Sequence, residues 1–135
     1  MEPIAKRSAC PIAFALDLLG DKWTLLIVRD LALKNRHTFS EMLRSEEGIA
    51  SNILTDRLSR LQRRGVVRKV RDPKDGRRFR YDLTEAGIDL LPALVELIAW
   101  AGRHDPTTVV GADFLRAIDD DRDAVVARFR DALGQ

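Results

Sequence analysis

The spacing of apolar residues in the N-terminal part of the chain predicts three helices. The first begins at Pro11, because a first helical position needs no amide hydrogen, and it ends at Gly20. A second apolar stripe predicts a helix over about residues 23–33. After a polar loop, a short third helix is expected over about residues 39–44.

The next segment carries the most informative pattern of the chain. Three leucines at positions i, i+4 and i+7 predict an amphipathic helix over about residues 51–64. Ser51 is the expected N-cap and Gly65 the expected C-terminal stop. At 100° per residue the opposite face of this helix is polar and basic. It comprises Asn52, Asp56, Ser59, Arg60 and Arg63.

Beyond Gly65 the period changes to the alternation that is typical of strands. Residues 66–71 and 79–83 predict the two strands of a β-hairpin, and the turn-forming residues between them predict its loop. The lysine and arginines in this loop make the tip of the hairpin basic. Thr84 is the expected cap of a long helix that runs towards Gly102 with a kink near Pro92. After residue 105, two more amphipathic helices are expected, separated by a run of three aspartates.

This order of elements is that of a winged helix-turn-helix. We therefore expect a mainly α fold with a small β-hairpin (α+β), in which the helix after the turn lies in the DNA major groove. The expected organisation is a winged-helix domain over residues 1–104 and a C-terminal helical extension of unknown role over residues 105–135. Within the domain we expect the helix-turn-helix over about 39–64, the wing over about 66–84 and a dimerisation helix over about 85–103.

Charge is strongly segregated along the chain although the net charge is only +2. Residues 1–84 hold 18 basic and 11 acidic side chains, whereas residues 85–135 hold 5 and 10. Residues 57–80 alone hold 11 basic side chains against two aspartates. A polyanion-binding face is therefore expected on the first part, and the acidic extension is not expected to contact DNA.

Composition excludes several other classes of protein. The 135 residues suffice for one domain with a small appendage, and no apolar run approaches the length of a membrane span. No signal peptide is expected, because the short apolar stretch near the N-terminus contains Asp17 and no small-residue cleavage site follows it. The single cysteine, Cys10, excludes an internal disulfide framework and fits a reducing cytoplasm. We find no metal-ligand set, no phosphate-binding glycine loop and no Cys–His pair, so neither a metal, a cofactor nor an enzymatic activity is expected.

The sequence also resembles the HxlR-type family of bacterial transcriptional regulators. The matching residues are Cys10-Pro11-Ile12, Ala15-Leu16-Asp17, Lys22-Trp23-Thr24-Leu25-Leu26-Ile27, Arg29-Asp30-Leu31, Phe39-Ser40-Glu41, Gly48-Ile49, Leu54-Thr55-Asp56-Arg57-Leu58, Leu61, Gly65, Tyr81-Asp82-Leu83-Thr84 and Gly87. The resemblance covers about residues 8–103 and implies a cytoplasmic homodimer that binds pseudo-palindromic DNA as repressor or activator. Ala50 departs from the pattern, because the family commonly has serine there, and the resemblance does not reach the extension.

The residues expected to contact DNA lie on the amphipathic helix and on the wing. Asn reads adenine and Arg reads guanine, while the wing arginines bind phosphates. The set is Ser51, Asn52, Thr55, Asp56, Ser59, Arg60, Arg63, Lys74, Arg77, Arg78 and Arg80. Asp56 fits only if it accepts from cytosine or pairs with an arginine. Arg57 is expected to be partly buried against a carboxylate such as Asp30, with phosphate contact as the second choice.

The long C-terminal helix of the winged domain has more apolar residues than one packed face needs. Its dimerisation candidates are Leu90, Leu94, Leu97, Ile98 and Trp100. The alternative is that the extension folds back and covers this surface within one chain. Trp23 and Trp100 are expected to serve packing, and His37 and His104 are expected at the surface.

Cys10 is a candidate redox sensor, because several regulators that this sequence resembles sense oxidants or electrophiles through a cysteine at the Cys-Pro-Ile position. A helix N-terminus and the nearby Lys6 and Arg7 favour the reactive thiolate. The alternative is a small buried apolar residue. An oxidant or a small molecule is thus a candidate effector.

The alternative function is an RNA-binding or protein-docking winged helix without a transcriptional role. No exposed aromatic side chain is expected near the basic face, and this argues against a protein that stacks the bases of single-stranded RNA.

Overall fold

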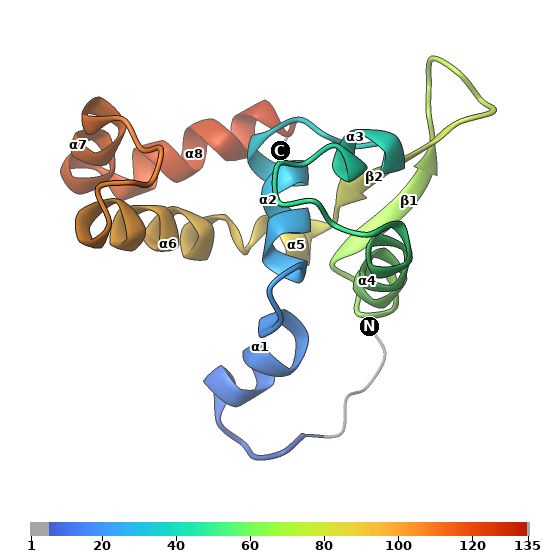
Figure 1. The fold of residues 1–135 in the computed structure, drawn as a ribbon, viewed down its shortest axis with the longest axis horizontal. Helices are drawn as coiled ribbons and strands as arrows, with labels where there is room; N and C mark the ends of the chain where they lie inside the picture. The colour runs from blue at the N-terminus through green and yellow to red at the C-terminus, as the bar shows by residue number, and fades with distance from the viewer. Residues whose placement is uncertain (1–5, 135) are drawn as a thin grey trace. The chain divides into compact units, whose positions relative to one another are not determined.

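The computed structural model describes residues 6–134, and its elements follow the predicted order (Figure 1). They are α1 (Pro11–Leu19), α2 (Thr24–Leu33), α3 (Phe39–Leu43), α4 (Ser51–Arg63), β1 (Val67–Arg71), β2 (Phe79–Leu83), α5 (Glu85–Ile88), α6 (Leu91–His104), α7 (Ala112–Asp120) and α8 (Arg122–Ala132). The predicted fold class, mainly α with one β-hairpin, is confirmed. Across residues 6–134, no helix is both long and apolar enough to cross a membrane.

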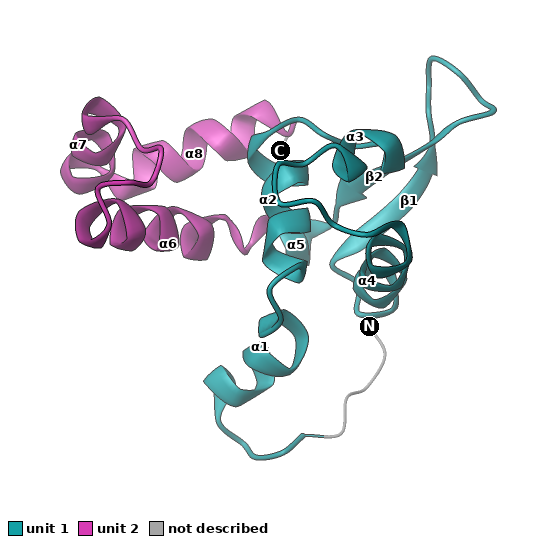
Figure 2. Cartoon of the chain, viewed as in Figure 1, with its two compact units in different colours: residues 1–87 teal, residues 88–135 magenta. Residues whose placement is uncertain are grey.

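The chain divides into two compact units, residues 1–87 and 88–135 (Figure 2). The expected kink at Pro92 is a complete break, since α5 ends at Ile88 and α6 begins afresh with Pro92 as its second residue. The dimerisation helix predicted over 85–103 is therefore two helices. This division also differs from the predicted boundary near residue 104, because α6 belongs to the C-terminal unit.

The helix-turn-helix consists of α3 and α4 in the N-terminal unit. Thr38 starts α3 with a capping box: its hydroxyl accepts from the Glu41 amide at 3.2 Å, and the Glu41 carboxylate accepts from the Thr38 amide at 3.0 Å. The N-cap of α4 is Ala50 and not Ser51, and no side chain caps this helix. The prediction for Ser51 was wrong because the helix begins one residue earlier than a serine cap requires.

The wing is the antiparallel pair β1–β2, in register from Val67 opposite Leu83 to Arg71 opposite Phe79. The segment before α3 lies along the outer side of β2, where the Tyr81 amide donates to the His37 carbonyl at 2.7 Å. The His37 ring nitrogen Nδ1 also lies 2.9 Å from the Tyr81 carbonyl, and its side chain is only 13% exposed. His37 is therefore a packed residue rather than the predicted surface histidine.

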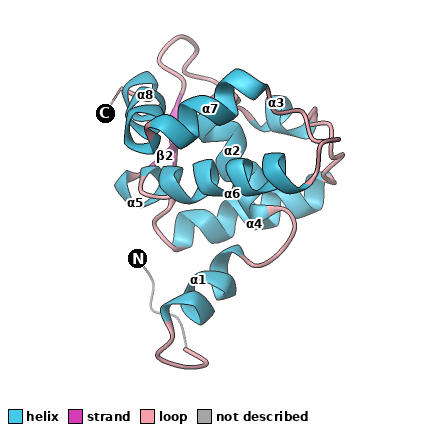
Figure 3. Ribbon diagram, turned by 90° about the vertical axis from the view of Figure 1, so that its left-hand side faces the viewer, coloured by secondary structure: helices cyan, strands magenta, loops and turns pink. Residues whose placement is uncertain are grey.

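The C-terminal unit is a bundle of α6, α7 and α8 with a core of its own (Figure 3 shows all three helices). Val95 and Ala99 of α6 are buried together with Ile118 of α7 and Val125 of α8. Half-buried apolar residues packed against this core are Ile98, Phe114, Ala117, Val126 and Phe129. The extension thus folds back onto α6 within one chain, as the alternative interpretation proposed.

This packing changes the set of dimerisation candidates. Leu94 is buried and Ile98 packs against the extension core, while Leu90 is half-buried. Leu97 and Trp100 remain exposed, at 51% and 62%. The burial of Leu94 makes it less available to an interface, while Leu90, Leu97, Ile98 and Trp100 stay predictions for dimerisation.

Candidate nucleic-acid interface

The exposed face of α4 carries the side chains expected to read DNA. Leu54, Leu58 and Leu61 are almost completely buried and fix the rotation of the helix on the core. The 100° step between residues then turns the other face to solvent. Exposed there are Ser51, Asn52, Thr55, Asp56 and Arg63, while Ser59 is half-buried and accepts a hydrogen bond from Arg63 at 2.8 Å.

Arg57 pairs with Asp21 and not with the predicted Asp30. Its Nε donates to Asp21 Oδ2 at 2.8 Å, and its Nη1 donates to Asp56 Oδ2 at 2.5 Å. The partial burial that the sequence predicted is confirmed, with 20% of the side chain exposed. Asp56 thereby has an arginine partner, which reduces the repulsion that a lone carboxylate would exert on a phosphate.

Arg60 is turned away from the exposed face of α4. It is half-buried, and its Nη2 donates to the backbone carbonyl of Asp17 in the last turn of α1. Its role in DNA contact stays a prediction, and its side chain is already engaged within the chain.

Asp21 is the acceptor on which several of these contacts converge. Its carboxylate accepts from the amides of Trp23 at 3.1 Å and Thr24 at 3.2 Å, from the Thr24 hydroxyl and from Arg57. Burial by itself raises the pKa of Asp21, but the hydrogen bonds from Thr24, Arg57 and the Trp23 amide outweigh it and lower the pKa to about 2. Asp21 is therefore ionised at neutral pH.

The wing presents its basic tip to solvent. Lys74, Arg77 and Arg78 are exposed, and two backbone hydrogen bonds close the loop that carries them, from the Asp72 amide to Arg78 at 2.9 Å and from the Arg78 amide to Asp75 at 3.0 Å. Arg80 is one-third exposed and donates to Asp82 at 3.0 Å, so it is less available than the other three.

Sequence reasoning missed one group of side chains on the wing. Phe79 is 41% exposed, and the Lys69 ammonium lies 4.5 Å and the Arg71 guanidinium 5.1 Å from the centre of its ring. The expectation that no exposed aromatic lies near the basic face was wrong. The alternation of residues in the hairpin could have predicted this cluster. Arg71 pairs with Phe79 and Lys69 with Tyr81, so these cations and rings lie on one face of the hairpin.

A buried ionic network holds the turn between α3 and α4. Asp30 is 3% exposed and accepts from the Ser45 hydroxyl at 2.6 Å, from Arg29 at 2.8 Å and from Arg36 at 3.4 Å. Arg29 also donates to Glu47 at 2.8 Å, and this hydrogen bond lowers the pKa of Glu47 and raises that of Arg29. The network ties α2 to the residues that lead into α4.

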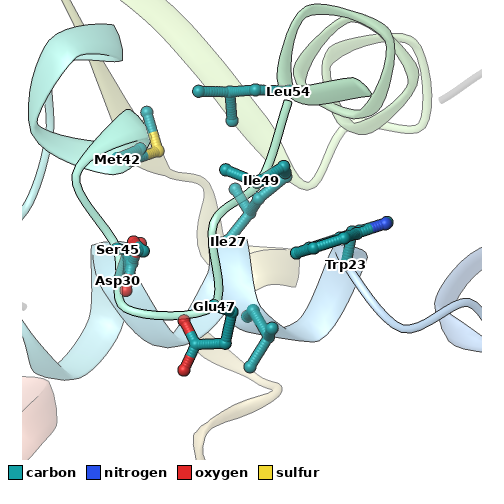
Figure 4. Close-up of a pocket in the computed structure, with 9 residues that line it drawn as sticks. Trp23, Ile27, Asp30, Met42, Ser45, Glu47, Ile49 and Leu54 are labelled. Carbon is teal, nitrogen blue, oxygen red and sulfur yellow. The ribbon is translucent and has the colours of Figure 1, made fainter. Parts of the chain in front are cut away.

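A hollow beside this network is lined by Asp30, Ser45 and Glu47 on one side and by apolar side chains and Trp23 on the other (Figure 4). Its empty space is about 220 Å³ including the part open to solvent. All three polar lining residues already accept or donate hydrogen bonds within the network. The hollow thus serves the packing of the helix-turn-helix. Trp23, which is half-buried at its edge, is a packing residue as predicted.

Cys10 lies at the N-cap of α1 and is exposed, which contradicts the alternative of a buried apolar residue. Lys6 and Arg7, the cations expected beside its thiol, contact other residues. Arg7 pairs with Asp17 at 2.6 Å, and the Lys6 ammonium lies 5.8 Å from the ring of Phe14. Within residues 6–134, no group of three His, Cys, Asp or Glu side chains is placed to hold a metal ion.

Comparison with known proteins identifies the class. Residues 18–108 match the family described as HxlR-like helix-turn-helix. The chain belongs to this family. The predicted membership of the HxlR family is therefore confirmed, and its relatives are named as HTH-type transcriptional regulators, which are not enzymes. The match ends before α7, so α7 and α8 lie outside the family region.

Three relatives show how far the similarity extends. The HTH-type transcriptional regulator Rv3095 of Mycobacterium tuberculosis is 39% identical over 92 residues, which are 68% of this chain and 57% of that protein. The chain thus spans little more than half the length of this HxlR-like relative. The crystal structure of PA1607, a candidate transcription factor, superposes with a TM-score of 0.69 at 36% identity, over 78% of this chain and 73% of the other. The redox regulator HypR in its oxidised form gives 0.62 at 27% identity, over 70% and 97%.

Proposed function

We propose that this HxlR-family chain is a transcriptional regulator that binds double-stranded DNA sequence-specifically as a homodimer in the cytoplasm. The observation that carries the proposal is the exposed polar face of α4 together with a wing tip whose Lys74, Arg77 and Arg78 are exposed, on the same compact unit. A helix of this kind fits the major groove, and a basic hairpin fits the adjacent backbone or minor groove.

Affinity and specificity come from different residues. Lys74, Arg77 and Arg78, together with Lys69 and Arg71, supply positive charge for phosphates, which favours any duplex and weakens with salt. Asn52 and the hydroxyls at the start of α4 supply the groups that discriminate base edges.

The dimer is supported by apolar side chains that the chain leaves uncovered. Leu97 and Trp100 on α6 are exposed, and so are Ile12 and Leu16 on α1. Large exposed apolar residues on a small protein favour an interface with another molecule. A two-fold dimer implies a pseudo-palindromic operator with half-sites about one or two helical turns apart.

The test is fluorescence anisotropy with a duplex from immediately upstream of the coding region, against random duplex and a single strand of the same sequence. We expect two subunits per duplex, binding that survives random competitor and a steep fall of affinity with salt. Replacing Arg77 and Arg78 with Ala should weaken binding to both duplexes alike and lower the salt slope by about one unit for each lost phosphate contact.

Two results would contradict the proposal. No binding to any duplex at low salt would exclude a DNA-binding role. Preference for the single strand would instead favour the RNA-binding alternative, for which the exposed Phe79 with Lys69 and Arg71 offers a stacking surface.

A further inference from the structure

We infer that Arg57 and Arg60 are positioning residues, which hold the recognition helix α4 to the end of α1 and to the connection that follows it (residues 20–23) instead of binding DNA. The inference rests on the proposed function and gives Arg60 a role other than the predicted base contact. It also makes the geometry with which α4 meets DNA depend on how α1 is held.

Arg60 donates a hydrogen bond to a backbone carbonyl at the C-terminal end of α1. Asp17 lies in the last turn of that helix, where backbone carbonyls have no partner within the helix. The Arg60 guanidinium donates to the Asp17 carbonyl, and a cation at a helix C-terminus is also favoured by the helix dipole. One side chain of α4 therefore completes the hydrogen bonding of α1.

Arg57 is bonded to the start of α2 through Asp21. The carboxylate accepts from the Trp23 and Thr24 amides at the first turn of α2 and from Arg57 Nε at 2.8 Å. Because Arg57 also donates to Asp56, two carboxylates occupy its guanidinium. The two carboxylates repel a phosphate and hold the Nε and Nη1 donors, which makes Arg57 a poor candidate for a DNA contact.

The two arginines act together because of their spacing. Residues three apart lie on the same side of a helix, so Arg60 can bond to the end of α1 while Arg57 bonds to Asp21 in the connection that leads to α2. No residue of α1 is buried, and Ile12 and Leu16 are exposed on it. Polar contacts to α4 are thus an important part of what orients α1. Any partner that covers the apolar face of α1 is thereby coupled to α4.

Positioning and phosphate binding predict different effects of the same substitution. If Arg57 or Arg60 bound a phosphate, Arg→Gln would weaken all duplexes equally and lower the salt slope by about one unit. As positioning residues, Arg57→Gln and Arg60→Gln should leave the slope unchanged and reduce the preference for a selected duplex over random duplex by about tenfold, comparable to a mismatched base pair. The selected duplex is the one that the unmodified chain enriches from a random pool. Arg77→Gln is the matched control that should lower the slope.

Asp21→Asn separates a charge effect from a positioning effect, because the first changes affinity and the second changes selectivity. Removing a negative charge from the DNA-binding unit should by electrostatics alone raise affinity for every duplex. If Asp21 positions α4 through Arg57, the preference for the selected duplex over random duplex also falls. Asp75→Asn, which makes the same charge change at the wing tip, should raise the affinity for both duplexes without loss of selectivity.

A second measurement needs no DNA. Cys10 is the single cysteine of the sequence, and it is exposed at the start of α1, so a nitroxide attached there reports the motion of this helix by electron paramagnetic resonance. The double variant Arg57→Gln, Arg60→Gln should sharpen the spectrum by freeing α1, whereas Arg77→Gln should leave it unchanged. Circular dichroism establishes that each variant is folded.

The outcomes are separable. An unchanged nitroxide spectrum in the folded double variant overturns the inference, and so does a salt slope that drops by one unit for each arginine. If the unmodified chain binds no duplex at all, the proposed function fails, while the nitroxide measurement still decides whether Arg57 and Arg60 hold α1.

Discussion

At the scale of single residues, Asp21 performs two tasks with one carboxylate. It accepts from the first amides of α2 and pairs with Arg57 of α4. The sequence resemblance marked Lys22 and Trp23 beside it, but only the fold shows that a residue 36 positions away is its partner. Its lowered pKa measures how strongly these contacts favour the ionised form.

The pH dependence of stability follows from that pKa. The folded value of about 2 lies below the ordinary value of 3.8, so the contribution of Asp21 is complete above pH 5 and is lost as the pH falls towards 2. We expect Asp21→Asn to lower the free energy of unfolding by about 2 kcal/mol at pH 7. Urea denaturation of both proteins checks this, and the difference should vanish near pH 2. A difference that is independent of pH would show that the charge of Asp21 is not responsible.

At the scale of elements, the helix α4 lacks a side-chain cap at its N-terminus. Ala50 is at the N-cap with extended backbone (φ −72°, ψ 148°), the conformation from which a serine hydroxyl reaches the second or third amide. The helix therefore depends on its buried leucines rather than on a capped first turn.

Supplying the missing cap should stabilise the protein. We expect Ala50→Ser to raise the free energy of unfolding by about 1 kcal/mol, because its hydroxyl accepts from an amide of the first turn. Thermal or urea denaturation measures the gain. Ser51→Ala is the control, since Ser51 stands inside the helix and caps nothing, and a loss as large as the gain at Ala50 would contradict the assignment of the cap.

At the scale of the whole molecule, the two compact units differ in charge and in what they leave exposed. The N-terminal unit has the basic helix and wing, and the C-terminal unit carries acidic helices that bury one side of α6. Leu97 and Trp100 are the exposed members of the predicted dimerisation surface on α6.

The assembly should therefore respond to substitutions at these two positions. We expect Leu97→Glu with Trp100→Glu to convert a dimer into a monomer in sedimentation velocity and to weaken operator binding, because charges buried in an interface are costly. Val109→Glu, at a fully exposed apolar residue, is the matched control and should leave the dimer intact. A dimer that persists in the double variant would move the interface elsewhere, for example to α1.

Local patterns determined most of the elements. The helical periodicity predicted the amphipathic helix, and the alternation of apolar and polar residues predicted the hairpin. The basic run of residues 57–80 predicted the charged surface. Each of these predictions depends only on residues that are close in sequence. The side-chain partners were less predictable. Asp30 was expected to hold Arg57 but accepts from Ser45 and two other arginines, and His37 lies packed on β2 instead of at the surface.

The packing of the helices sets which apolar and charged side chains contact one another. The residue pattern predicted a winged helix-turn-helix of the HxlR type with a basic amphipathic helix and a basic wing. It could not determine that α7 and α8 cover Ile98, or that Arg60 turns to the end of α1, because both depend on contacts between segments distant along the chain. Periodicity specifies which face of a helix is buried, whereas the partner of that face is set by how the helices pack.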